Sequence, residues 1–244
     1  IIVGQAALTR ADSAAILAAA YEAANAYCVK DGWNGFNVLQ SAASRVGALE
    51  LGFISAGGIN ALKADAKAGK LKLVFNLSAD EGDLSVFDGS FVVYIGSHGD
   101  AGAKMADVIL PAAAYTEKST TYINTEGRVQ RTEKAVFAPG DAREDWTIFR
   151  ALSDVVGKTL PYDTLAALRA RIAKDVPLTN TLDTLPAAEW KAFGTAGDIA
   201  GEALMADADT FYSSNPVLRA SDVMTDIINA RSGQPVEEAT GTHG

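Results

Sequence analysis

Cysteine is almost absent from this chain of 244 residues. A single residue, Cys28, excludes an intrachain disulfide and any metal site or iron–sulfur cluster that needs several thiolates from this chain. Long apolar runs are missing too, because candidates such as residues 91–95 are only as long as a strand. A helix that spans a bilayer needs about 20 apolar residues. We therefore expect no transmembrane segment.

Positive charge is also scarce. The chain has 21 basic and 30 acidic side chains, which gives a formal charge of −9. Lysine and arginine occur mostly singly and close to an acid, as in Lys63 with Asp65 and Arg143 with Glu144, so no basic patch is evident. A polyanion would meet net repulsion, and nucleic acid is not an expected partner.

Apolar residues make up 48% of the chain, enough for one large domain or two small ones. The first residue is Ile1, and residues 1–3 have the composition of a strand. We expect the chain to be the later part of a longer polypeptide, so its start carries no information about targeting.

Short apolar runs alternate with helical patterns, which is typical of a parallel sheet covered by helices. The predicted fold class is α/β, with an open, mostly parallel sheet of about four strands and helices on both faces. Strand 71–77 is apolar at most positions, as expected of a strand buried on both faces. The predicted strands are residues 1–3, 71–77, 91–95 and 106–110. The predicted helices of this part are 13–28, 38–49 and 59–68.

The rest of the chain is expected to be helical and irregular. Asp141 to Glu144 has the spacing of a capping box, which predicts a helix that ends at Gly157. Asp163 is the expected cap of a helix at 165–176. Weaker patterns predict helices at 187–193 and 221–230. We divide the chain into an α/β domain at 1–176, a mixed extension packed on it at 177–231, and a mobile tail at 232–244.

Two segments that follow predicted strands contain candidate functional residues. His98, in a Gly-Ser-His-Gly-Asp sequence, is a candidate general base or hydrogen-bonding group, but a tight turn explains its glycines more simply. Asp80, Glu81 and Asp83 offer oxygen ligands for a cation, although a solvated acidic turn fits their spacing better. The Ala-Gly-Gly at 56–58 lacks the other residues of a phosphate-binding loop.

Cys28 lies on the apolar stripe of a predicted helix, which favours a small core residue over a nucleophile or a molybdenum ligand. The polar segment at 116–130 leaves two interpretations open. It is either a binding loop or a covering loop whose side chains satisfy its own backbone. Its polar side chains are Thr116, Glu117, Thr120, Thr121, Asn124, Glu126, Arg128 and Gln130.

The pattern ADVILPAAAYTEKS at 106–119, followed by NTEGRVQ at 124–130, resembles the molybdopterin-dependent oxidoreductases. It is most similar to the large iron–sulfur subunit of respiratory complex I, of the 75 kDa type. Further matching stretches are residues 14–19, 99–100, 139–140, 142–146, 150–153 and 160–165.

The resemblance implies the C-terminal, molybdopterin-oxidoreductase-like domain of that subunit. In this family NADH is oxidised and quinone reduced, and 2Fe-2S and 4Fe-4S clusters are held by N-terminal cysteines that this chain does not contain. The resemblance thus implies a structural and assembly domain, with no catalytic, cofactor-binding or metal-binding residue within 1–244. Its expected partners are the N-terminal part of the same subunit and other peripheral-arm subunits.

The resemblance also implies a location. The peripheral arm lies on the cytoplasmic face of a bacterial inner membrane or the matrix face of the mitochondrial one. Two alternatives stay open: the C-terminal portion of an active molybdopterin enzyme such as a formate dehydrogenase, and a stand-alone module that binds a nucleotide near His98.

Overall fold

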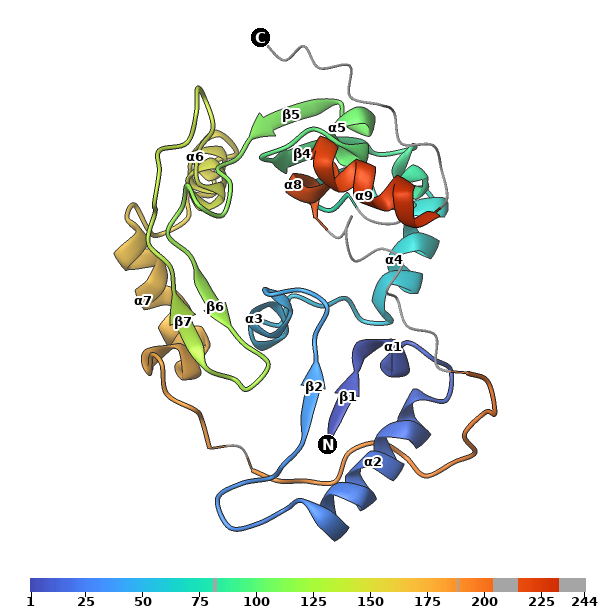
Figure 1. Cartoon of the computed structure of the whole chain (residues 1–244). Helices are drawn as coiled ribbons and strands as arrows, with labels where there is room; N and C mark the ends of the chain where they lie inside the picture. The colour runs from blue at the N-terminus through green and yellow to red at the C-terminus, as the bar shows by residue number, and fades with distance from the viewer. Residues whose placement is uncertain (81–82, 188, 204–214, 233–244) are drawn as a thin grey trace. The chain divides into compact units, whose positions relative to one another are not determined.

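The computed structural model describes residues 1–80, 83–187, 189–203 and 215–232 (Figure 1). The chain forms two compact units, each built from segments that are far apart in the sequence. Unit 1 contains Ile1–Ala56, Tyr115–Phe137 and Phe149–Ala206, and unit 2 contains Gly57–Ala114, Ala138–Ile148 and Asp207–Gly244. The predicted bounds at residues 176 and 231 stay a prediction. The predicted tail at 232–244 lies outside the described residues, apart from Ser232, which ends a helix.

Unit 2 is built on a parallel sheet, which agrees with the predicted α/β class. The strand order is β3 (Leu73–Leu77), β4 (Phe91–Gly96) and β5 (Val108–Pro111), and both pairs are parallel. The central strand β4 is buried from its second residue onward. Pro111 lies at the end of the edge strand, where its missing N–H removes no hydrogen bond from a central ladder.

The unit 2 strands β3 and β4 are joined through the single turn η1 (Ser85–Phe87), and β4 and β5 through α5 (Ala101–Met105). The other helices that lie wholly in unit 2 are α4 (Gly58–Lys67), α8 (Pro216–Arg219) and α9 (Asp222–Ser232). The helices predicted at 59–68 and 221–230 are confirmed as α4 and α9.

One face of this sheet, called the open face below, leaves large apolar side chains exposed around a buried centre. The register places Leu73 beside Phe91, and residues two apart on a strand point the same way, so Leu77 and Val108 share this face. Val93 and Ile95 of β4 lie on the same face and are buried. The exposed fraction is 51% for Leu73, 50% for Phe91, 46% for Leu77 and 38% for Val108. The prediction that residues 71–77 form a strand buried on both faces is therefore wrong.

Unit 1 contains a second parallel pair, β1 (Ile2–Gly4) and β2 (Asn37–Leu39). The predicted sheet of about four strands is thus incorrect, because residues 1–3 pair with β2 and not with β3 to β5. The helix predicted at 38–49 is also partly wrong, since pairing with β1 draws Val38 and Leu39 into a strand and α3 covers only Arg45–Glu50. Local apolar spacing does not report such non-local pairing.

The helix predicted at 13–28 is confirmed as α2 (Ser13–Tyr27), which follows the short α1 (Gln5–Leu8). Tyr27 lies at helical spacing with the apolar residues of α2, but it is 84% exposed and does not belong to a buried stripe. The described residues of 187–193 have no regular secondary structure, so the helix predicted there is wrong. This segment packs on α2 through aromatic rings: Trp190 stacks on Tyr21 at 5.3 Å between ring centroids, and Phe193 meets Tyr21 edge-on at 5.2 Å.

The remainder of unit 1 contains an antiparallel hairpin and helices (Figure 1). The hairpin pairs β6 (Thr121–Ile123) with β7 (Val129–Arg131), and Leu182 bridges to Val129. Beyond it lie α6 (Asp145–Val155), α7 (Leu165–Asp175) and the short η2 (Pro177–Asn180).

Both predicted helix caps are wrong in detail. Helix α6 begins at Asp145, after the proposed capping box, although Gly157 follows its end with φ 70° as expected. Helix α7 is capped by Thr164, whose side-chain oxygen accepts a hydrogen bond from the Ala167 N–H at 3.1 Å. Asp163 instead accepts a hydrogen bond from Nε of Arg150 at 2.9 Å.

Among the residues that the structure describes, none of the helices is both long enough and apolar enough to cross a bilayer.

Candidate functional site

The carboxyl ends of parallel strands are the usual place for a ligand in open α/β sheets, and in unit 2 this place is filled by a polar cluster. Asp80 follows β3, and its residue is only 7% exposed. The backbone N–H of Gly102 donates to its Oδ1 at 2.7 Å, and the Tyr94 hydroxyl donates to its Oδ2 at 2.9 Å. We call Asp80, Tyr94, Asp100, Gly102 and Arg219 the Asp80 cluster.

The Tyr94 hydroxyl is shared between two acceptors. It lies 2.9 Å from Oδ2 of Asp80 and 3.0 Å from the carbonyl oxygen of His98, but it has one proton to donate. A carboxylate is the stronger acceptor, so Asp80 is the preferred partner. Burial raises the pKa of Tyr94 far above its usual value, and the hydrogen bond and charge of Asp80 raise it further. Tyr94 is therefore a fixed donor and not an acid catalyst.

Arg219 of α8 completes the cluster. Its Nε donates to Oδ2 of Asp100, and its Nη2 lies 3.8 Å from Oδ2 of Asp80. The hydrogen bond from Arg219 lowers the pKa of Asp100, helped by the Ala101 N–H. One guanidinium thus faces two carboxylates and ties α8 to the end of the sheet.

Close packing leaves no room for a ligand beside Asp80. A Cβ added at Gly102 would lie 2.6 Å from a Tyr94 ring carbon and 2.7 Å from Oδ1 of Asp80, closer than real Cβ contacts. Glycine is therefore required where α5 approaches the sheet. The arrangement suits the joining of helices to the sheet, and it presents no open reactive group.

His98 lies at this end of β4, as the sequence predicts. Its Nδ1 is 2.9 Å from the Ser97 hydroxyl, and the residue is half-buried. No carboxylate contacts its ring among the described residues, which agrees with the simpler interpretation of a turn residue.

The acidic turn divides its side chains between separate partners. Asp80 turns inward, whereas Asp83 accepts hydrogen bonds from the Ser85 hydroxyl at 2.6 Å and the Ser85 N–H at 3.0 Å. These bonds lower the pKa of Asp83 and start the η1 turn. Glu81 lies outside the described residues, and no group of three or more metal-ligating side chains occurs within them.

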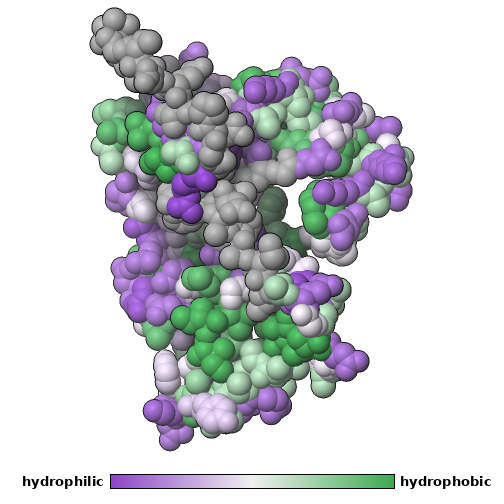
Figure 2. All heavy atoms as spheres, turned by 45° about the vertical axis from the view of Figure 1, so that its right-hand side comes forward, coloured by the Kyte–Doolittle hydropathy of each residue, from purple (hydrophilic) through white to green (hydrophobic). Residues whose placement is uncertain are grey.

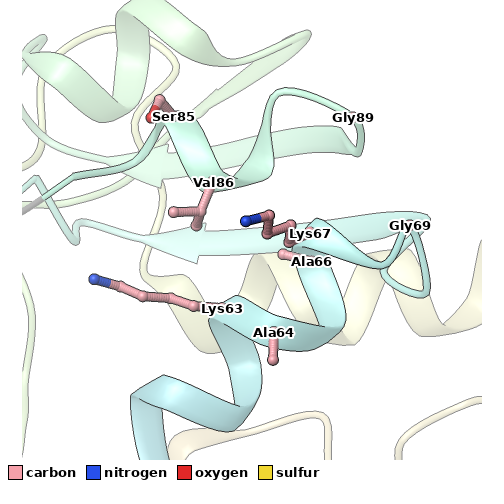
Figure 3. Close-up of a pocket in the computed structure, with 8 residues that line it drawn as sticks. All are labelled: Lys63, Ala64, Ala66, Lys67, Gly69, Ser85, Val86 and Gly89. Atoms are coloured by element: carbon pink, nitrogen blue, oxygen red, sulfur yellow. The ribbon is translucent and has the colours of Figure 1, made fainter.

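A hollow of about 520 Å³ lies in unit 2 between α4 and η1 (Figure 3). In Figure 3 the Lys63 and Lys67 side chains extend from α4 toward the same side, and Val86 of η1 lies opposite them. Both lysines are exposed, and the charge of Lys63 contributes to lowering the pKa of Asp83. The lining of the hollow thus carries two exposed positive charges and no buried polar side chain that would hold a ligand.

The polar segment at 116–130 is largely a hairpin whose side chains satisfy its own backbone. Oδ1 of Asn124 accepts from the backbone N–H groups of Glu126 and Arg128, at 2.9 and 3.0 Å. Arg128 donates through Nη1 to the carbonyl oxygen of Asp183 at 2.5 Å. The covering-loop interpretation is therefore favoured over a binding loop for these residues.

Cys28 is half-buried at the C-terminal end of α2, against the backbone of Gly35, and has no metal-ligating neighbours among the described residues. Its position fits the predicted packing role better than a nucleophile.

Sequence reasoning missed the Asp80 cluster. One signal was available, because a tyrosine within the apolar strand 91–96 needs a partner for its hydroxyl once it is buried. Arg219 gave no such signal, since nothing local in the sequence connects it with Asp80 or Asp100.

Comparisons with known proteins agree with the parallel sheet and the sequence patterns. Residues 1–155 match the family model of molybdopterin oxidoreductase. The chain is 40% identical over 228 residues to the NADH-ubiquinone oxidoreductase 75 kDa subunit of Reclinomonas americana, which covers 92% of this chain and 33% of that protein. It is 41% identical over 201 residues to the mitochondrial 78 kDa subunit of Neurospora crassa, covering 79% of this chain and 26% of the relative.

The mitochondrial 78 kDa subunit of Candida albicans is 42% identical over 208 residues, covering 81% of this chain and 28% of that subunit. The chain spans about a third or less of the length of these relatives. Among solved structures, acetylene hydratase from Pelobacter acetylenicus aligns with a TM-score of 0.38 and 16% identity, over 72% of this chain and 25% of the hydratase.

The match over residues 1–155 covers more than half of the chain, and the three relatives named above are 75 or 78 kDa subunits of NADH-ubiquinone oxidoreductase. This chain belongs to the molybdopterin oxidoreductase family, and within it resembles the 75 and 78 kDa subunits of respiratory complex I.

Proposed function

We propose that this chain is a structural and assembly domain of the large iron–sulfur subunit of a proton-pumping NADH:quinone oxidoreductase. Its role is to pack against the cluster-bearing part of the same subunit and against neighbouring peripheral-arm subunits. The full enzyme is an oxidoreductase, and its arm faces the bacterial cytoplasm or the mitochondrial matrix. No catalytic residue is assigned within this chain.

The open face of the unit 2 sheet is the observation that supports this proposal most directly. Parallel sheets are covered on both faces in nearly all proteins. On this face the centre, Val93 and Ile95, is buried, but Leu73, Leu77, Phe91 and Val108 around it are between 38% and 51% exposed. Large exposed apolar patches mark interaction surfaces. Such a face fits a domain that is completed by other protein.

Unit 1 also exposes many large apolar residues. Figure 2 shows apolar surface in the lower half of the view, at the height of α2 and β1 in Figure 1. The exposed large apolar residues of the first segment of unit 1 are Ile1, Ile2, Tyr27, Trp33, Leu39, Leu49, Leu51, Phe53 and Ile54. Both units thus carry surface suited to burial in an assembly.

The same domain is proposed to bind no pterin cofactor. The molybdopterin cofactor that gives the family its name carries a phosphate, and the Asp80 cluster puts a carboxyl group at the carboxyl end of the sheet. Gly102 and Tyr94 fill the space beside it. The residues present do not fit an anionic cofactor there, and the 2Fe-2S and 4Fe-4S clusters of the family are assigned to segments outside this chain.

A surface substitution in the full-length subunit tests the proposal. Phe91→Asp places a charge on the open face at a position that is already half exposed, so the isolated chain should still fold. We expect the yield of assembled complex to fall severalfold, whereas iron–sulfur spectra of the complex that does form stay unchanged. Lys72→Asp, at an exposed position beside the start of β3, is the control for added negative charge. Normal assembly and full NADH oxidation by the Phe91→Asp enzyme would contradict the proposal.

A further inference from the structure

A second hollow, of about 440 Å³, lies within unit 1 between β7, α7 and η2. Two arginines and no acidic residue line it, in a chain whose net charge is −9. The rest of the lining is mainly small or apolar. The lining residues are Arg131, Leu165, Ala166, Arg169, Ala170, Ala173, Thr179, Asn180 and Leu182.

Arg169 has two hydrogen-bond donors with no acceptor. Its Nε and Nη2 are shielded from solvent, and neither has a hydrogen-bond partner within the described part of the chain. A buried polar group without a partner is costly, and more so when it is charged. Most such groups in native proteins are satisfied, so this pair indicates an acceptor that lies outside the described residues.

The two unsatisfied nitrogens identify the class of acceptor. Nε and Nη2 form one edge of the guanidinium, and their two N–H groups point the same way and match the two oxygens of a carboxylate. The other polar groups of the hollow are already engaged. The Thr179 hydroxyl donates to the Val176 carbonyl at 2.8 Å, and the Asn180 amide donates to the carbonyls of Ala173 and Pro177 at 3.2 and 3.0 Å.

We propose that this hollow receives the carboxylate of an aspartate or glutamate side chain on another protein segment, with Arg169 as its bidentate partner. Leu165, Ala166, Ala170 and Leu182 provide an apolar floor for the residues that flank the acid, which favours a protein segment over a free anion. Arg131, exposed at the end of β7, adds a second positive charge. Arg169 lines the hollow but its Nε and Nη2 are shielded from solvent, so the proposal requires the side chain to turn toward the opening when the carboxylate enters.

This inference deepens the proposed function, because an assembly domain needs specific contacts of this kind. Arg171 provides a matched control on the same helix, since its Nε already pairs with Asp175 at 2.7 Å in an exposed i, i+4 bridge. Any substitution made at Arg169 can be made at Arg171, where it causes the same change of charge on α7 at a residue that does not line the hollow.

The first experiment uses the 244-residue chain, with the Nε–H signal of Arg169 followed by NMR. The probes are the capped tripeptide acetyl-Leu-Glu-Leu-amide, the same peptide with glutamine, and inorganic phosphate. We expect the glutamate peptide alone to shift the Arg169 signal saturably. Arg169→Lys, which keeps the charge and loses the fork, should weaken binding about tenfold, and Arg171→Lys should leave it unchanged.

Each alternative outcome overturns the inference. A shift with phosphate as large as with the glutamate peptide would show a free-anion site, and no shift with any probe would show that nothing docks. A loss with Arg171→Lys equal to that with Arg169→Lys would show that binding does not depend on the Arg169 fork in particular.

The second experiment uses the assembled enzyme. Arg169→Glu should lower the yield of complex severalfold, and Arg171→Glu should not. If the two variants assemble equally, the docking site is refuted even if the Phe91→Asp test supports the assembly role. If instead the peptide binds but Phe91→Asp has no effect on assembly, the carboxylate site stands and the proposed function fails.

Discussion

Tyr94→Phe isolates the contribution of one hydroxyl to the stability of unit 2. The Tyr94 ring is fully buried, with 1% of the residue exposed, and phenylalanine keeps its packing in β4. The substitution removes the donor that lies 2.9 Å from Oδ2 of Asp80. That oxygen is then left with Arg219, whose Nη2 is 3.8 Å away.

The magnitude follows from the loss of a buried hydrogen bond to a charged group. Such a bond contributes about 1.5–3 kcal/mol, and an acceptor left without its donor keeps the penalty of burial. Since 1.4 kcal/mol is a factor of ten, the population of open states of unit 2 should rise roughly 10- to 100-fold.

Native-state hydrogen exchange measures this change segment by segment. Backbone amides of β4 should exchange roughly 10- to 100-fold faster in Tyr94→Phe than in the wild type. Amides of the hairpin β6–β7 belong to unit 1 and serve as an internal control that should not change.

Asp80→Asn supplies the second side of a double-mutant cycle. In this variant the new amide can donate to the Tyr94 oxygen, and the hydroxyl proton can go to the His98 carbonyl at 3.0 Å. Because these bonds join neutral groups, adding Tyr94→Phe to Asp80→Asn should cost less than Tyr94→Phe costs in the wild type, where the acceptor is charged. An equal cost in both backgrounds, or less than a twofold change in β4 exchange, would refute the assigned hydrogen bond.

Three further changes test other contacts. Gly102→Ala should destabilise unit 2 by about 1–3 kcal/mol because its Cβ would collide with Tyr94, whereas Gly99→Ala, with open space around it, should be nearly neutral in the same exchange assay. The Arg10 hydrogen bond keeps the pKa of Asp12 well below its usual range, so Asp12 should stay ionised through the ordinary carboxyl range at about pH 4 and the bond from the Ala200 N–H should weaken only at lower pH. The Ala200 amide shift in NMR should therefore stay constant as the pH falls through about 4, and a change centred there would contradict the prediction. Trp190→Ala should lower the stability of the segment at 189–199 by about 2 kcal/mol and speed its limited proteolysis, while Trp190→Phe, which retains an aromatic ring, should lose much less; equal proteolysis of the two would contradict the stacking argument.

Local apolar patterns were sufficient to predict the elements whose formation depends on residues close in the sequence. Residues 91–95 form a central strand because five consecutive apolar positions can be buried on both sides, and the pattern at 13–28 gives helix α2 for the same local reason. The α/β class followed from the alternation of these elements.

The errors arose where distant segments decide the structure. Val38 and Leu39 have apolar neighbours at helical spacing, but pairing with residues 2–4 makes them a strand. Residues around Trp190 do not form the predicted helix, and the indole ring stacks on Tyr21. The local sequence does not reveal this contact with a distant residue.

The candidate site shows the same limit. His98 was correctly placed at the end of a strand, yet the residue that matters most there is Asp80, through partners contributed by β4, α5 and α8. Composition identified the acids in this turn, but only the fold assigns Asp80 to the interior and Asp83 to the η1 turn.

The order in which the chain is synthesised determines when each unit can fold, because each unit is built from segments that are far apart in the sequence. Unit 1 is closed by the aromatic segment around Trp190, and the Asp80 cluster of unit 2 is closed by Arg219, so both depend on residues that leave the ribosome late. Before then, α2 presents Tyr21 without its covering rings and Asp80 is buried without its guanidinium. A nascent chain stalled after residue 188 is thus expected to be a better chaperone client than one stalled after residue 232.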